Sequence, residues 1–270
     1  MFFPSSRDRA SAIGAGLHFG QAGTHLSRTM MLTELTALLA AVPANGKAQE
    51  YASSVIEENC LGKQTAANRR HSLQHLRELY ALDPTVSLFR ILRRLWEVDV
   101  SSRALLALLA SLARDPLLRA TAEVIVGMPD GTELQRASMR EHLFGIVRDG
   151  MNASTLDKVV RNAASSWSQS GHLEGRTFKF RRLVRPTPAC ISYGLYLARA
   201  AGLTIENSLS SGWIKILDCS RSGALDLAGA AKRLGLIDLR MAGDVIDLNL
   251  NRLDPAFQSS SQAKVTHGAH

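Results

Sequence analysis

The sequence contains 270 residues, of which 46% are hydrophobic, 21% are charged and only 6% are aromatic. Its 32 lysines and arginines exceed its 24 acidic residues, which gives a formal net charge of +8 and suggests an anionic partner. The three cysteines lie far apart, which argues against a disulfide scaffold and a cysteine-based zinc finger. No stretch approaches the roughly 20 apolar residues of a membrane span, which argues against a membrane protein. We therefore expect a cytoplasmic protein.

The first part of the chain is predicted to be helical. Residues 1–27 are rich in Gly, Ser and Ala and are expected to form a loose N-terminal arm. Residues 28–150 are expected to form a helical bundle, because leucines recur at helical spacing between short polar connections. Thr65 and Asp115 are predicted N-caps, and Pro84 and Pro116 are each expected at the first position of a helix.

The pattern changes after Gly150. Residues 151–255 are expected to form one or more winged-helix-like α+β modules with short β-hairpins, and residues 256–270 a disordered tail. Ser154 is a candidate N-cap for a helix that ends near Gln169, and residues 173–184 alternate in the manner of a β-hairpin. The fold class expected overall is therefore mainly α. Helix, turn, helix and hairpin is also the order of a winged helix-turn-helix.

The helix after Ser154 is predicted to have one apolar face and one face suited to DNA. Leu156, Val159, Val160, Ala163 and Trp167 share the apolar face. The candidate DNA-contacting residues, which are polar or basic, are Thr155, Lys158, Arg161, Asn162 and Ser165 on the helix, and Arg176, Lys179, Arg181 and Arg182 on the hairpin. Arg161 and Asn162 are the best candidates for reading base edges.

Local charge supports this interpretation. Between residues 151 and 190 there are seven cations and two acids, so this segment carries a net +5. The second helix and hairpin, residues 221–255, have five basic and five acidic residues and are expected to be structural or to contact protein. A second basic cluster, which includes Lys63, Arg69 and Arg70, is either a solvated helix face or a further DNA contact. A small α+β module with a merely solvated basic face is the simpler alternative.

Enzyme motifs are absent from the sequence. We find no P-loop, no HExxH and no GxSxG, and we expect no catalytic residue, no cofactor, no metal site and no small-molecule substrate. His71 and His75 have a spacing that can bind a metal ion, but arginines surround them and no third ligand stands at a recognisable offset.

Four parts of the sequence match one family in the same order. They are residues 57–65 (EENCLGKQT) with the basic helix 66–80, Trp96 and the helix after it, the DPLL step at residues 115–118, and residues 154–171. They resemble the BrxA family, the accessory proteins of BREX bacteriophage-resistance systems. The resemblance spans about residues 10–185. It implies a helical N-terminal region, a winged-helix-like part, DNA binding, and a role in phage defence beside larger BREX subunits, and it brings no catalytic residues.

Together these patterns predict a non-enzymatic accessory protein of a BREX-type system that binds double-stranded DNA mainly through phosphates. Two alternatives stay open. The protein could be an adaptor whose basic surface binds acidic patches on partner subunits, or a transcriptional regulator with a defined operator.

Overall fold

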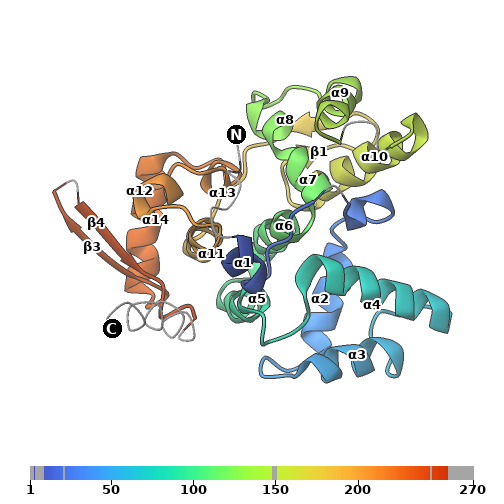
Figure 1. Ribbon diagram of the computed structural model, residues 1–270, viewed down its shortest axis with the longest axis horizontal. Coiled ribbons are helices and arrows are strands. Elements are labelled where there is room, and N and C mark those ends of the chain that lie inside the picture. Colours follow the sequence, from blue (N-terminus) through green and yellow to red (C-terminus); the bar gives the residue numbers. More distant parts are fainter. Residues whose placement is uncertain (1–2, 4–8, 21, 148–150, 244, 255–270) are drawn as a thin grey trace, which may run out of the picture.

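The computed structural model describes residue 3 and residues 9–20, 22–147, 151–243 and 245–254, and the expected tail at 256–270 lies outside these ranges. The chain is mainly helical and carries two small antiparallel hairpins, which confirms the expected mainly α class (Figure 1). Within the described residues, no helix combines the length and the apolar character needed to cross a membrane.

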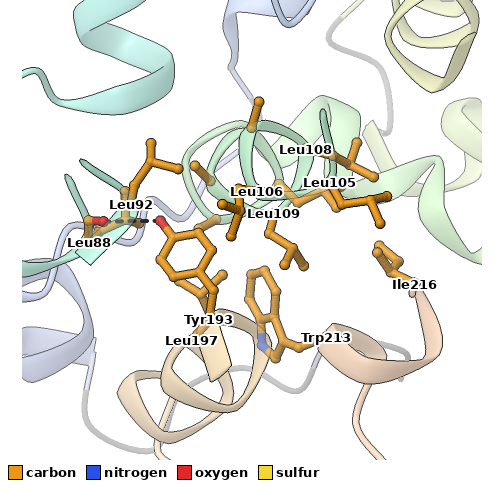
Figure 2. Close-up of a cluster of buried hydrophobic side chains, with 14 of the residues drawn as sticks. Leu88, Leu92, Leu105, Leu106, Leu108, Leu109, Tyr193, Leu197, Trp213 and Ile216 are labelled. Atoms are coloured by element: carbon orange, nitrogen blue, oxygen red, sulfur yellow. Dashed lines mark hydrogen bonds between the residues drawn. The ribbon is translucent and has the colours of Figure 1, made fainter. Parts of the chain in front are cut away.

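Helix α6, Arg103–Arg114, forms the centre of the core. Every residue from Leu105 to Ala113 is buried, as expected of a helix that is apolar on all sides. It packs against α4 (Ala66–Tyr80), α5 (Ser87–Val98) and α11 (Pro188–Ala200). Figure 2 shows leucines of α6 packed against Leu88 and Leu92 of α5 and, next to these, against Tyr193, Leu197 and Trp213. The Tyr193 hydroxyl donates a hydrogen bond to the Leu88 carbonyl at 3.1 Å and joins α11 to α5.

The helices around α6 begin close to their predicted positions. Helices α2 (Leu32–Ala41) and α3 (Ala48–Ile56) lead into α4, whose predicted cap is confirmed because the Thr65 hydroxyl accepts from the Asn68 amide. Asp115 likewise caps α7, Pro116–Ala120, as predicted. The prediction for Pro84 was wrong, because α5 begins at Ser87. Asp83 instead accepts a hydrogen bond from the Thr85 amide in the turn that precedes α5.

The N-terminal segment packs against the core rather than forming a loose arm. It contains α1 (Arg9–Gly14) and the short 3₁₀ helix η1 (Thr24–Leu26). Ala12, Leu17 and His25 are fully or almost fully buried, and the Leu88 amide donates to the Ala15 carbonyl. Sequence composition did not reveal this packing, because glycine and serine are frequent both in flexible segments and in close-packed ones.

Residues 116–184 form a second group of elements. Helices α7, α8 (Ala122–Gly127), α9 (Arg136–Val147) and α10 (Ala153–Gln169) precede strands β1 (Leu173–Glu174) and β2 (Phe180–Arg181). Residues 131–134 also pair with β2, through hydrogen bonds of 2.7–2.9 Å that involve Gly131, Thr132 and Leu134. This pairing, and the packing of α9 on α10, place α9 with the elements that follow it. The expected boundary at residues 150 and 151 therefore separates elements that pack together. No local pattern in the sequence indicates this long-range pairing.

The C-terminal part continues from α11. Short helices α12 (Ile205–Ser208) and α13 (Gly212–Lys215) precede α14 (Arg221–Arg233), and strands β3 (Asp238–Ala242) and β4 (Val245–Asn249) form the second hairpin predicted from the sequence. Helix α14 packs along α11, and the hairpin extends beyond it (Figure 1). Ser220 caps α14, because its side chain accepts a hydrogen bond from the Gly223 amide.

His172, a buried residue just before β1, makes the fold sensitive to acid. Burial lowers the pKa of its imidazole to about 4, although hydrogen bonding to the Ile216 carbonyl and the charge of Asp218 act in the opposite direction. The unfolded chain therefore binds this proton at a higher pH than the folded chain does. The free energy of unfolding is expected to be highest above pH 6.5 and to fall by roughly 1–3 kcal/mol as the pH drops towards 4.5.

Urea unfolding at a series of pH values measures this dependence. A His172→Gln variant keeps a side chain that can hydrogen-bond but does not titrate, so its stability should decrease less steeply over the same range. Equal decreases in the variant and the unaltered protein would contradict the assignment.

Candidate nucleic-acid interface

Helix α10 has the two faces predicted from the sequence. Leu156, Val159, Val160, Ala163 and Trp167 are buried against the core. The Trp167 indole donates a hydrogen bond of 2.7 Å to the Thr121 hydroxyl, which fixes the rotation of the helix about its axis. The helix begins at Ala153 under a cap from Asn152, whose side chain accepts from the Thr155 amide, and not under Ser154 as expected.

The predicted polar face of α10 is only partly available to a ligand. Lys158 and Arg161 are exposed, and neither side chain forms a hydrogen bond or ion pair with another described residue. Asn162 instead donates its amide to the His25 carbonyl at 2.9 Å, and Ser165 is half-buried. The prediction that Asn162 reads a base edge is therefore not supported, because η1 packs over this part of the helix and occupies its amide. Thr155, on the first turn, is half-buried.

A buried polar network holds η1 on α10. The imidazole of His25 lies with Nδ1 at 2.8 Å from Asp115 Oδ2 and Nε2 at 2.8 Å from Ser166 Oγ, and all three side chains are at most 1% exposed. The Met30 amide also donates to Ser166 Oγ. Burial raises the pKa of the Asp115 carboxyl, but the electrostatic attraction and hydrogen bonds of His25 and the amide of Leu118 outweigh it, so the pKa lies below its usual range.

This Ser–His–Asp arrangement resembles a hydrolase triad in its connectivity only. A nucleophile has to reach a substrate, and Ser166 is completely buried with its oxygen held by the Met30 amide and the Asn162 carbonyl. The network therefore has a structural role, which is to join three segments that are distant in the sequence.

The hairpin arginines differ from the prediction most clearly at Arg181. Its side chain is fully buried, donates from Nε to the Ile125 carbonyl at 2.9 Å, and forms an ion pair with Asp218. Asp218 also accepts a hydrogen bond from the Val184 amide. Arg181 was thus wrongly predicted to contact DNA. The alternation of aromatic and basic residues placed it in the hairpin but did not show that its side chain faces the core.

The other hairpin cations remain at the surface. Arg182 is exposed and forms an ion pair of 2.6 Å with Glu174, across the ribbon. Lys179 is half-buried and donates to Ser168 Oγ at 2.7 Å; burial, and then the charge of Arg136, lower the pKa of its ammonium. Arg176 is exposed and has no hydrogen bond or ion pair with another described residue.

The second basic cluster, on and before α4, is largely engaged within the protein. Lys63 forms an ion pair of 2.9 Å with Glu34, and Arg69 donates to the Ile56 carbonyl at the same distance. Arg70 is exposed and lines a separate hollow beside α4. This cluster therefore contributes less positive charge at the surface than its sequence indicates.

Two arginines that sequence reasoning missed complete the basic surface. An open hollow of about 610 Å³ lies between α9 and α10, and its charged lining residues are Arg136, Arg140, Asp157 and Arg161. Arg136 and Arg140 stand one turn apart on α9, which the sequence assigned to the bundle, so they were not counted with the cations of α10. The signal available in the sequence was their spacing of four residues, which places them on one side of a predicted helix. We define the basic surface as Arg136, Arg140, Lys158, Arg161 and Arg176.

The carboxylate of Asp157 partly neutralises the basic surface. Arg140 contacts Asp157 at 3.5 Å, and both side chains are about half exposed, at 48% and 54%. Exposed pairs of this kind contribute at most about 1 kcal/mol and are screened by salt. A phosphate oxygen can therefore replace the Asp157 carboxylate on Arg140 at little cost.

No metal site emerges from the described residues, within which no three His, Cys, Asp or Glu side chains converge. His75 lies 3.2 Å from Glu78, an acid one turn along α4.

Comparison with known proteins finds no relative: no protein-family model matches the chain, and no curated protein matches it.

Replacing Arg181 should destabilise the protein. An Arg181→Met variant leaves the buried Asp218 carboxylate without its cation, and breaking a buried ion pair in this way costs about 3–5 kcal/mol. Urea unfolding measures the loss. The exposed Arg182→Met is the matched control and should unfold at the same urea concentration as the unaltered protein. A stable Arg181→Met variant would show that the ion pair is not required for the fold.

Proposed function

We propose that the protein binds double-stranded DNA through the basic surface, by contacts with phosphates. The observation that carries this proposal is the hollow between α9 and α10, where three arginines converge with a single carboxylate among the described lining residues. Two further exposed cations belong to this surface: Lys158, on α10 with Arg161, and Arg176, next to Thr177, whose carbonyl accepts from Arg136. Guanidinium groups bind phosphate oxygens in pairs, and clustered cations release counterions from DNA.

The arrangement of residues 122–181 supports the proposal. The order is helix α8, a short extended segment at 131–134, helices α9 and α10, then β1 and β2, with β2 paired to both β1 and the extended segment. A winged helix-turn-helix has this order and this pairing, and its second helix lies in the major groove of DNA. In the proposed complex α10 takes that place, and the loop between β1 and β2 forms the wing.

The proposed binding has little sequence selectivity. Asn162 is occupied by the His25 carbonyl, so Arg161 is the remaining candidate for base readout among those predicted on α10. Phosphate contacts position a protein on the duplex but do not distinguish bases. Affinity is therefore expected to depend steeply on salt and weakly on the DNA sequence.

The resemblance to the BrxA family gives the proposal a biological setting. It supports a non-enzymatic accessory role in a BREX-type phage-defence system, alongside other subunits of that system. A protein that binds duplex DNA without selecting a sequence suits such a role, because the DNA of an invading phage has no fixed operator.

A charge-balanced pair of variants tests the proposal. The first variant replaces Arg136, Arg140, Lys158 and Arg161 with Gln. The control replaces Arg221, Lys232, Arg233 and Arg240, which are exposed on α14 and β3, with Gln, so both variants lose the same charge. Affinity for a duplex is measured by fluorescence anisotropy from about 50 to 200 mM salt.

The first variant should lose most of its affinity, and the slope of log K against log salt should become shallower by about 0.9 for each phosphate contact removed. The control should keep both the affinity and the slope of the unaltered protein. Equal losses in the two variants would mean that net charge, rather than this surface, drives binding.

An adaptor role is favoured by one further observation. The hollow beside α4 is lined by apolar side chains, which include Ile56 and Leu73, and by three arginines, Arg70, Arg77 and Arg114, against the single carboxylate of Glu78 among the described lining residues. Such a surface suits an acidic peptide of a partner subunit better than a duplex. Co-purification with partner proteins before and after nuclease treatment separates the two functions, because an adaptor keeps its partners and a DNA-bridged association does not.

A further inference from the structure

The loop between β1 and β2 exposes an aromatic ring next to the basic surface. Phe178 is 63% exposed, although phenylalanine is usually among the most buried residue types. It lies between Arg176, which is exposed, and Lys179. Phe180, two residues further on, is also 38% exposed.

The loop is held in one shape rather than left to fluctuate. Gly175 has a φ of +113°, and a Cβ at this position would lie 2.0 Å from the Phe178 carbonyl oxygen, so the backbone closes on itself tightly here. The Lys179 ammonium donates to the Gly175 carbonyl at 3.2 Å and to Ser168 Oγ on α10. Arg136 of α9 donates to the Thr177 carbonyl at 3.4 Å. Both helices that line the hollow therefore position the loop that carries Phe178.

We propose that Phe178 is a stacking residue that recognises an unpaired or unstacked base, so that the preferred ligand is duplex DNA interrupted by a gap or a fork. This inference rests on the proposed function, because the basic surface must bring the duplex to the loop. An exposed ring in a loop matches a flat, apolar partner, and a nucleobase offers that face together with the phosphates that the neighbouring cations need. In an intact helix each base is already covered by its neighbours, and the ring would have to displace one.

The position of Phe178 distinguishes it from the other exposed apolar side chains nearby. Leu183 is 60% exposed and follows β2, beyond the loop that Arg136 and Lys179 hold. It has similar exposure but no ring with which to stack. Leu183→Ala is therefore the matched control for Phe178→Ala.

The experiment compares two DNA ligands with the same flanking sequences. One is an intact duplex, and the other carries a short single-stranded gap with 2-aminopurine as its unpaired base. Fluorescence anisotropy gives the affinity, and the 2-aminopurine emission reports stacking on that base. Phe178→Ala should weaken binding to the gapped ligand by about 5- to 150-fold, the range expected for one stacked base. It should change binding to the intact duplex little, and it should abolish the change in emission.

The outcomes separate this inference from the function on which it rests. If the unaltered protein binds both ligands equally and Phe178→Ala behaves like Leu183→Ala, the stacking role is overturned and duplex binding stands. If the unaltered protein binds neither ligand, the proposed function and the inference both fail. A preference for the gapped ligand that disappears in Phe178→Ala alone supports the inference.

Discussion

The position of α10 depends on the buried contact between His25, Asp115 and Ser166. These side chains come from the N-terminal segment, the junction of α6 and α7, and α10, and the imidazole lies 2.8 Å from each of its two partners. Asp115 also caps α7 through the amides of Leu117 and Leu118, so a single carboxylate orients one helix and holds the segment that covers another. With this contact and the Trp167 indole in place, α10 has only one orientation, and Lys158 and Arg161 face outward.

Much of the positive charge in this sequence serves the fold rather than a ligand. Three arginines donate hydrogen bonds to carbonyls at the ends of helices. Arg93 binds two carbonyls at the end of α2, Arg114 two at the end of α4, and Arg119 two at the end of α6. The accepting carbonyls belong to Leu39 and Val42, to Arg77 and Glu78, and to Leu112 and Ala113, respectively. The last carbonyls of a helix lack donors within the helix, and a guanidinium can supply two at once. Burial lowers the pKa of Arg114 and of Arg119 to about 10, which still leaves both charged near neutral pH. Net charge is therefore a poor guide to the surface, and the placement of each arginine decides what it does.

The sequence predicted most local features, although the start of α5 and the cap of α10 lie two or three residues from their expected positions, and it predicted the long-range contacts poorly. The caps at Thr65 and Asp115, the apolar face of α10 and both hairpins follow from patterns within a few residues, and the structure confirms them. The burial of Arg181 follows from Asp218, which lies 37 residues away, and the loss of Asn162 as a base reader follows from His25, which is 137 residues away. Neither contact leaves a periodic signal in the sequence. Arg136 and Arg140 were missed for the same reason, because only the packing of α9 on α10 brings them beside Arg161.

The central claim is that a polyanion binds at the hollow between α9 and α10. Arginine-specific chemical labelling with and without duplex DNA, read by mass spectrometry, tests it most directly because it reports each side chain separately. The account predicts that DNA protects Arg136, Arg140 and Arg161, while Arg221, Arg233 and Arg240 on α14 and β3 are labelled as before. Protection of the second group alone, or no protection at all, would contradict it.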